Sequence, residues 1–361
     1  MARSNKRDIS IACFNLLNLG LPGLPIYGKD GWTELEYAAK LAFCESRLAE
    51  IDADIIGFQE CWDAEALAEL FDRPALKDRY DLVARTLSPR GIQVALAARK
   101  GMLREEPRWI EELPENARFT DLREARDAEE SVTVTIRKFS RPLLRVVVNK
   151  AAGSPNIVVY VAHLKSKGPT TLRYDRDNPV LRDNSFIARS VVSHVRRMVE
   201  AGAFRAILDD ELSGNDRPLV VIGDLNDSSI SVSTELLSGN PGYRFFAKST
   251  AGSKSDTGLY SVEKLQQLRS FRHVYYTHIF KNQMESLDHI MVSDSFYDHS
   301  SIRKWSFREM NILNDHLTST EAERRRLGQN DHGIVAARFD WNPMVEEAEK
   351  ILEEAGSPAV S

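Results

Sequence analysis

The sequence has few cysteines, and their arrangement excludes two kinds of stabilising cross-link. Cys13, Cys44 and Cys61 are odd in number and far apart, and there is no Cys-x-x-Cys pair. The sequence therefore indicates neither a disulfide framework nor a thiolate zinc site. We interpret each cysteine as a small buried apolar side chain, which fits a reducing compartment. A cytoplasmic location is expected.

Long apolar runs are also absent. No uninterrupted apolar stretch is long enough to span a membrane, so we expect no membrane span. Residues 1–26 place basic residues before apolar ones, as a signal peptide does. Asp8, Asn15 and Asn18 interrupt that stretch, and residues 8–16 are better explained as an opening β-strand.

The chain also lacks a strong charge of one sign. Lys and Arg number 48 against 53 Asp and Glu, which gives a formal net charge of −5. This argues against a protein that coats nucleic acid nonspecifically, but it allows an enzyme with a local basic groove. Hydrophobic residues make up 42% of the 361 residues, enough for a sizeable core.

Short apolar segments rich in β-branched residues predict buried strands. Their continuous apolar character means that both faces of each strand are covered. These segments are residues 8–16, 92–99, 143–149, 156–164, 218–225 and 287–293. Residues 131–139 alternate instead, as a half-exposed strand does.

Helical segments lie between the strands. Residues 33–51 open with Thr33 and Glu36 in capping-box spacing, and residues 63–71 form a shorter candidate. Residues 184–202 place apolar side chains on one side and end at a glycine. With no linker, repeat or low-complexity block, we expect one domain over 1–345, then a helix end and loose tail over 346–361.

Polar side chains follow the apolar segments where the predicted strands end. Singly, each has an ordinary explanation: Glu60 could cap the next helix, and His163 could be a satisfied core histidine. Together they predict a pocket suited to an anionic substrate and a hard cation. The set is Asn15, Glu60, His163, Lys165, Lys167, Asp224, Asn226, Asp288, Asp331 and His332.

This order of residues resembles the endonuclease/exonuclease/phosphatase superfamily, the deoxyribonuclease I-like fold. The resemblance runs from Ile9 to Phe339. The stretches "RGIQVALAAR", "FSRPLLRVVV" and "HLKSKG" are similar to a bacterial extracellular-nuclease-like branch. The resemblance implies an α/β fold: a four-layer α/β/β/α sandwich of two mixed β-sheets flanked by helices.

The resemblance also implies a metal site. Glu60 would be the principal Mg²⁺ ligand, supported by Asn15 and Asp331, and Mn²⁺ could substitute. Magnesium takes only one or two carboxylates from most proteins, so this sparse set is sufficient. Many relatives carry an acidic residue where this chain has Leu17, which makes a second metal there less expected.

The remaining residues would carry the chemistry and hold phosphate. Asp224 would orient or deprotonate the attacking water, and Asn226 would hold that water or a phosphoryl oxygen. His332, held by Asp288, would contact the phosphate or transfer a proton, and His163 would be a second group facing the phosphate. The residues expected to meet substrate phosphates are Lys165, Lys167 and Arg189.

The leading hypothesis is a Mg²⁺-dependent phosphodiester hydrolase, preferably a nuclease, in which water attacks phosphorus in line. Its expected partner is a phosphodiester substrate such as nucleic acid; the oligomeric state stays open. The alternative is a phosphatase or phosphodiesterase for a small phosphorylated molecule or lipid head group. A catalytically inactive binding module is a remote alternative. A basic groove would favour the first and an enclosed pocket the second.

Overall fold

The structure is a computed structural model that describes residues 5–115, 136–169, 185–253, 256–274 and 276–344. Most of the half-exposed strand expected over 131–139 lies outside the described residues, as does the expected tail over 346–361.

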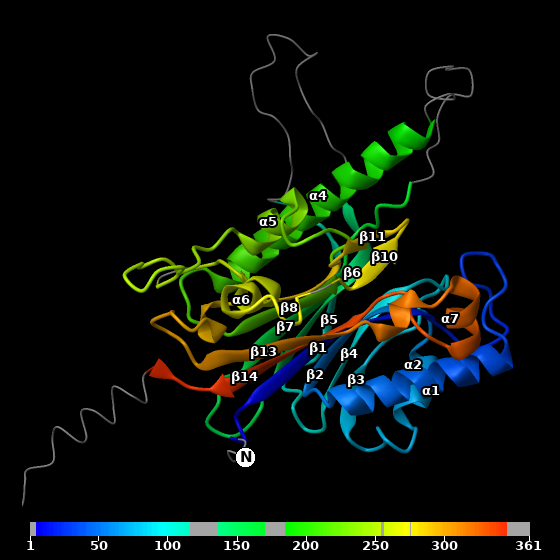
Figure 1. Ribbon diagram of the computed structural model, residues 1–361, viewed down its shortest axis with the longest axis horizontal. Helices are drawn as coiled ribbons and strands as arrows, with labels where there is room; N and C mark the ends of the chain where they lie inside the picture. Colours follow the sequence, from blue (N-terminus) through cyan, green and yellow to red (C-terminus); the bar gives the residue numbers. More distant parts are fainter. Residues whose placement is uncertain (1–4, 116–135, 170–184, 254–255, 275, 345–361) are drawn as a thin grey trace, which may run out of the picture.

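One half of the molecule is a six-stranded mixed sheet (Figure 1). Its strand order is β13-β14-β1-β2-β4-β3, with β1 parallel to β2 and antiparallel to β14. The strands are β1 (Ile9–Leu19), β2 (Ile55–Cys61), β3 (Tyr80–Val83), β4 (Gln93–Arg99), β13 (Trp305–Leu313) and β14 (Ile334–Trp341).

The second half is another six-stranded mixed sheet, with the order β5-β6-β7-β8-β12-β9. Here β7 and β8 are parallel and β12 is antiparallel to β8. The strands are β5 (Arg108–Glu112), β6 (Lys138–Val148), β7 (Ile157–His163), β8 (Leu219–Asp224), β9 (Tyr260–Ser261) and β12 (Asp288–Val292). A separate hairpin joins β10 (His278–Phe280) to β11 (Gln283–Glu285).

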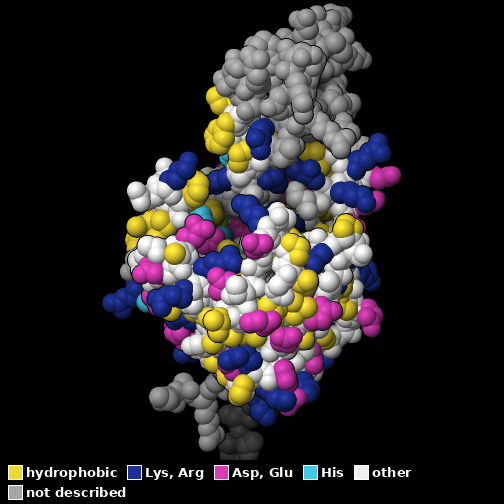
Figure 2. Space-filling view, turned by 90° about the vertical axis from the view of Figure 1, so that its right-hand side faces the viewer, with side chains coloured by type: hydrophobic (Ala, Val, Ile, Leu, Met, Phe, Trp, Pro, Cys, Tyr) yellow, Lys and Arg dark blue, Asp and Glu magenta, His cyan; other side chains and the backbone are white. Residues whose placement is uncertain are grey.

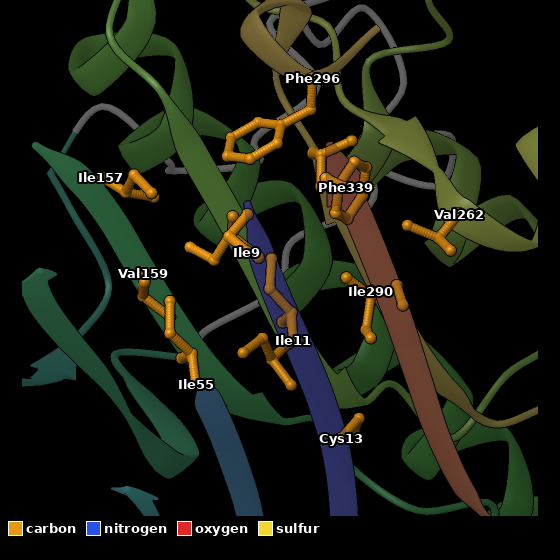
Figure 3. Packing of buried hydrophobic residues seen from close by; sticks show 14 of the residues in the cluster. Ile9, Ile11, Cys13, Ile55, Ile157, Val159, Val262, Ile290, Phe296 and Phe339 are labelled. Carbon is orange, nitrogen blue, oxygen red and sulfur yellow. The ribbon is translucent and has the colours of Figure 1, made fainter. Parts of the chain in front are cut away.

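The main core lies between the two sheets. Apolar side chains of β1 and β2 face those of β7 and β12 (Figure 3). The sheets approach so closely that a Cβ on Gly57 would lie 2.6 Å from Ile222 Cγ2. A glycine within a buried strand is therefore required by packing at this position.

Helices cover the outer faces. On the first sheet lie α1 (Glu34–Ile51) and α2 (Ala64–Phe71), whose apolar side chains join a second core cluster. On the second lies α4 (Ser185–Leu212), with α5 (Val232–Ser238) packed against it. At the edges, α6 (Val262–Arg269) contacts β12 and β13, and α7 (Glu321–Leu327) contacts α1. The predicted four-layer α/β/β/α sandwich is confirmed.

The helix predictions were right except at one end. The Thr33 capping box is present: Thr33 Oγ1 accepts from the Glu36 amide at 3.3 Å, and Glu36 Oε2 accepts from the Thr33 amide at 2.9 Å. The end predicted at Gly202 is wrong, because α4 continues to Leu212. Phe204 and Leu208, beyond the glycine, are fully buried in the cluster between α4 and the sheet. That packing outweighs the modest helix cost of one glycine.

Candidate active site

The candidate site is the last layer of the core between the sheets. Along β8, side chains alternate between faces, so Val220 and Ile222 face the other sheet and Asp224 follows them on the same side. Strand pairing places His163 of β7 and Asp288 of β12 directly beside Asp224. An apolar strand therefore ends in a carboxylate because its last inward position lies at the rim, where the two sheets stop.

A histidine spans two of these carboxylates. His332 Nδ1 lies 2.8 Å from Asp288 Oδ2, and its Nε2 lies 3.9 Å from Asp224 Oδ2. Burial opposes a charged ring, but Asp288 and then Asp224 raise the pKa of His332 well above its ordinary value. The pairing of Asp288 with His332 expected from the sequence is thus present, and it favours the charged form of the ring.

Asp224 is the centre of the hydrogen-bonded group. Its Oδ2 accepts from Asn15 Nδ2 at 3.1 Å and lies 3.5 Å from His163 Nε2, and its Oδ1 accepts from the Asn226 amide at 2.9 Å. Burial raises the pKa of Asp224 to about 7, although His332 acts in the opposite direction. A carboxylate with this pKa can accept a proton near neutral pH.

His163 is the neutral histidine of the pair. Burial, followed by the charges of Arg141 and His332, holds the pKa of His163 well below its ordinary value. The neutral ring has one N–H, and its Nδ1 is buried without a hydrogen-bond partner. Its Nε2 is the nitrogen that faces Asp224, 3.5 Å from Oδ2.

Glu60 lies beside this group on a strained backbone. Its φ is 59°, and Leu17 and Asn18 at the end of β1 have φ of 46° and 55°. Glu60 Oε2 accepts from the Asn18 amide at 3.1 Å. Burial and then the charge of Asp331 raise the pKa of Glu60. Strained residues and a repelled buried carboxylate at one place are typical of a functional site.

The other predicted residues are placed less directly. Asn226, in left-handed conformation with φ of 55°, donates from Nδ2 to the Leu164 carbonyl at 3.1 Å. Lys165 Nζ donates to the carbonyls of Ser166 and Gly168 at 3.2 and 3.1 Å. Lys167 Nζ lies 2.7 Å from both oxygens of Glu285 on β11. Arg189 lies near the start of α4, and its side chain is half-buried.

Three residues of the site were missed in the sequence. Arg141 of β6 donates to the Leu164 carbonyl at 3.1 Å, and its charge lowers the pKa values of Glu60 and His163. Lys40 of α1, fully buried, donates to the side chain of Asn330. His278 of β10 packs on His332, with ring centroids 4.8 Å apart. None of the three lies at the end of a long apolar strand. That position was the signal by which the other site residues were predicted from the sequence.

The donor chemistry of the site fits a divalent cation. Among the described residues, two groups offer ligand atoms within 4.8 Å of one another: Asp224, Asp288 and His332, and His278, Asp331 and His332. Asp288 Oδ1 is buried without a hydrogen-bond partner. Glu60 and Asp331 add hard carboxylates whose mutual repulsion a cation would relieve.

The Endonuclease/Exonuclease/phosphatase family matches residues 33–319, so the chain belongs to that family, whose members are metal-dependent phosphoester hydrolases. The superfamily predicted from the sequence is confirmed; the extracellular-nuclease-like branch stays a prediction. No curated protein matches the chain. Among the described residues, no helix combines the length and apolar character that crossing a bilayer requires.

Solved structures share the fold at low identity. An endonuclease/exonuclease/phosphatase family protein of Bacteroides thetaiotaomicron is 14% identical, with 93% of this chain and 95% of that one covered and a TM-score of 0.51. TDP2 of D. rerio, complexed with single strand DNA product, is 14% identical, with 92% and 99% covered and a TM-score of 0.51. The mannosyl-6-phosphatase Bt3783 of B. thetaiotaomicron is 13% identical, with 92% and 100% covered and a TM-score of 0.50.

Proposed function

We propose that this protein is a Mg²⁺-dependent phosphodiester hydrolase that cleaves nucleic acid by in-line attack of water on phosphorus. The observation that carries the proposal is the connected group at the rim of the paired sheets. In it Asp288 holds His332, and Asp224 joins His332, His163 and Asn15 within 3.9 Å. The group combines a base, a cation and neighbouring metal donors, as hydrolysis of an anionic ester requires.

Glu60, Asn15 and Asp331 would hold the metal ion. Their oxygen donors suit Mg²⁺, and Mn²⁺ accepts the same ligands. When bound, the ion would neutralise phosphate charge and stabilise the charge that develops in the transition state. The raised pKa of Glu60, caused by burial and then by Asp331, supports this assignment because both causes favour a cation between the two carboxylates.

Different side chains of the protein would accept and donate the protons of the reaction. Asp224, with a pKa of about 7, would accept the proton of the attacking water. His332, charged and fixed by Asp288, would stabilise the phosphoryl oxygens or protonate the leaving oxygen. Asn226 would orient the water, and Arg141 adds positive charge next to Glu60 and His163. General acid–base catalysis contributes about 10² to 10⁴-fold, and the electrostatic contribution is usually larger.

The substrate class is inferred from the relatives in fold and from the charges around the site. One solved relative in fold carries a single strand DNA product, and another is a mannosyl-6-phosphatase. Figure 2 looks onto the side where the β10–β11 hairpin and α7 lie; among the described residues visible there, several Lys and Arg gather in the upper part, and Lys and Arg are mixed with Asp and Glu below it. Lys167 is paired with Glu285. These observations keep a phosphatase of small phosphorylated molecules as the second candidate.

A substrate panel tests the proposal. The full chain is assayed with Mg²⁺ and with Mn²⁺ on single-stranded and duplex DNA, RNA, nucleotides, sugar phosphates and bis-p-nitrophenyl phosphate. We expect hydrolysis of nucleic acid that disappears in Asp224→Asn and with EDTA. Cleavage confined to phosphomonoesters would support the second candidate. No metal-dependent hydrolysis of any phosphoester would refute both and leave the inactive binding module.

Two further predictions belong with this proposal. We propose that residues 1–345 act as one domain, because both sheets supply residues of the site. A cytoplasmic location is proposed because all three cysteines are free and buried, as a reducing compartment allows.

A further inference from the structure

A second group of metal donors adjoins the proposed magnesium ligands, and it has different chemistry. His278, Asp331 and His332 each offer one ligand atom, all within 4.8 Å of one another. The group contains two imidazoles and one carboxylate, whereas Glu60, Asn15 and Asp331 offer oxygen alone. Imidazole nitrogen suits zinc and related transition metals, and magnesium strongly prefers oxygen.

One of the two imidazoles is oriented by a carboxylate, and the other has a ring nitrogen without a partner. Asp288 lies 2.8 Å from His332 Nδ1, which leaves Nε2 as the donor atom. A carboxylate behind a histidine in this way is typical of zinc sites. His278 Nδ1 is buried without a hydrogen-bond partner, although buried ring nitrogens normally have one. A bound cation would supply the missing partner.

The backbone fixes the position of His278. The β10 strand bridges His278 to His332, and the Gly333 amide donates to the Thr277 carbonyl at 2.6 Å. Thr277 is fully buried, and its hydroxyl accepts from the Leu287 amide at 2.9 Å. Both histidines therefore stand on backbone that is held in register, so the site is formed before an ion arrives.

We propose that His278, Asp331 and His332 bind a transition-metal ion of the zinc type, and that this ion inhibits the hydrolase. Binding rests on these three residues alone; the inhibitory effect rests on the proposed function. Zinc at this site would displace the proton of His332 Nε2 to solvent, bind that nitrogen, and share Asp331 with the magnesium ligands. His332 could then neither contact phosphate nor transfer a proton, so Zn²⁺ would inhibit turnover even at saturating Mg²⁺.

Binding is tested without any substrate. Co²⁺, which replaces Zn²⁺ and absorbs visible light, is titrated into the full chain in the presence of excess Mg²⁺, and Zn²⁺ affinity is measured by calorimetry. We expect one Co²⁺ per chain with a low-symmetry visible spectrum. His278→Gln should weaken Zn²⁺ binding by about 100-fold or more, since even residues that only support a ligand contribute about 10 to 100-fold.

Two variants serve as controls for the fold. His278→Cys restores a ligand at the same position and should recover Zn²⁺ affinity with a stronger, sulfur-type Co²⁺ spectrum. His299→Gln removes an exposed histidine that follows the C-terminal end of β12, whereas Asp288 stands at the N-terminal end of that strand. This variant should bind Zn²⁺ as the wild type does. Equal Zn²⁺ affinity in wild type and His278→Gln, or failure of His278→Cys to recover binding, would overturn the site.

Inhibition is a separate measurement. Within each variant, turnover with Mg²⁺ is compared with and without micromolar Zn²⁺, and His278→Gln should lose most of the zinc sensitivity. If Co²⁺ binds through His278 but no phosphoester is hydrolysed, the metal site stands and the proposed function fails. If hydrolysis occurs and zinc inhibits the wild type and His278→Gln equally, the proposed hydrolase function stands and the inhibitory site is refuted.

Discussion

Glu60 shows, for a single residue, how features that serve an active site can lower the stability of the fold. Its backbone is in the left-handed region, and burial followed by the charge of Asp331 raises the pKa of its carboxyl. We predict that Glu60→Gln, which keeps the shape and the contact with the Asn18 amide, stabilises the metal-free protein by about 1 kcal/mol and raises Tm by about 1–2 °C. Turnover should fall by about 100-fold or more.

Thermal unfolding with EDTA and with Mg²⁺ measures both effects. Binding to the native state stabilises it by mass action, so Mg²⁺ should raise the Tm of the wild type. In Glu60→Gln the rise should be nearly lost. An equal Mg²⁺-dependent rise in both proteins would show that Glu60 is not a metal ligand.

Asp288 acts on the reaction through His332. In Asp288→Asn the ring keeps a neighbour of similar size but loses the carboxylate that, opposing burial, raises its pKa. We predict that kcat falls by about 10² to 10³-fold and that the NMR titration of the His332 ring moves to lower pH. Asp315→Asn, an exposed carboxylate paired with Arg47, should change neither. A His332 titration unchanged in Asp288→Asn would contradict the assignment.

The sequence predicted those site residues that lie at an end of a buried strand. Asp224 and His163 were found because each ends an apolar run, and Asp288 because it begins one; strand pairing then places them side by side. Arg141 was not found, since it stands within β6, and only the packed structure shows its charge near Glu60. His278 was not found because its strand has only three residues, too few to give a recognisable apolar run.

At the scale of elements, α1 supplies a buried lysine, Lys40, that contacts the site from the outer face of the sheet. Lys40 is fully buried, burial lowers its pKa, and it donates to Asn330, whose Nδ2 donates to the Asn15 carbonyl at 2.6 Å. A helix on the outer face of the sheet thereby positions a residue at the rim. Lys40 is a positioning residue because it acts through Asn330.

We predict that Lys40→Met raises the Mg²⁺ concentration needed for half-maximal activity several-fold and changes stability by less than about 1 kcal/mol. Losing the buried charge is favourable, but the Asn330 oxygen is left unpaired, so the two effects oppose each other. Mg²⁺ titration of activity and urea unfolding measure them. Lys77→Met, at a lysine 56% exposed, should change neither quantity. An unaltered Mg²⁺ requirement in Lys40→Met would exclude this role.

The helix α4 marks the limit of what periodicity predicts. Its apolar side chains recur at helical spacing, yet Phe186, Val191 and Val195 are 65%, 54% and 37% exposed. The first turns of α4 extend beyond the sheet, whereas its last turns pack on it (Figure 1). Periodicity predicts which side of a helix is apolar, but not how far the sheet beneath it extends.

At the scale of the whole molecule, the paired sheets explain where the site lies. Side chains between the sheets alternate strictly, so the final inward positions of β1 and β8 are Asn15 and Asp224, which share a hydrogen bond of 3.1 Å. The sandwich was predicted through the family resemblance and the continuous apolar strands. The register that joins Asn15 to Asp224, 209 residues apart, depends on long-range packing that no local pattern contains.

An ionic cluster joins α4 to the second sheet. Because it contains a carboxylate, the stability of the fold should depend on pH. Glu211 of α4 accepts from Arg145 of β6 at 2.9 and 3.0 Å and from Tyr160 of β7 at 3.0 Å. Burial opposes ionisation of Glu211, but Arg145 and Arg217 outweigh it and lower the pKa to about 2 from 4.5.

A depressed carboxyl pKa stabilises the fold above the unfolded value, and this contribution is lost as pH falls toward the folded value. We predict that Glu211→Gln costs on the order of 3 kcal/mol in the free energy of unfolding at pH 7, from the size of the pKa shift. The difference from wild type should shrink as pH falls from about 4.5 toward 2. Urea unfolding across this range measures it, with Asp209→Asn on the same helix, 48% exposed, as the control. A difference that stays constant with pH would show that the charge of Glu211 does not hold α4 to the sheet.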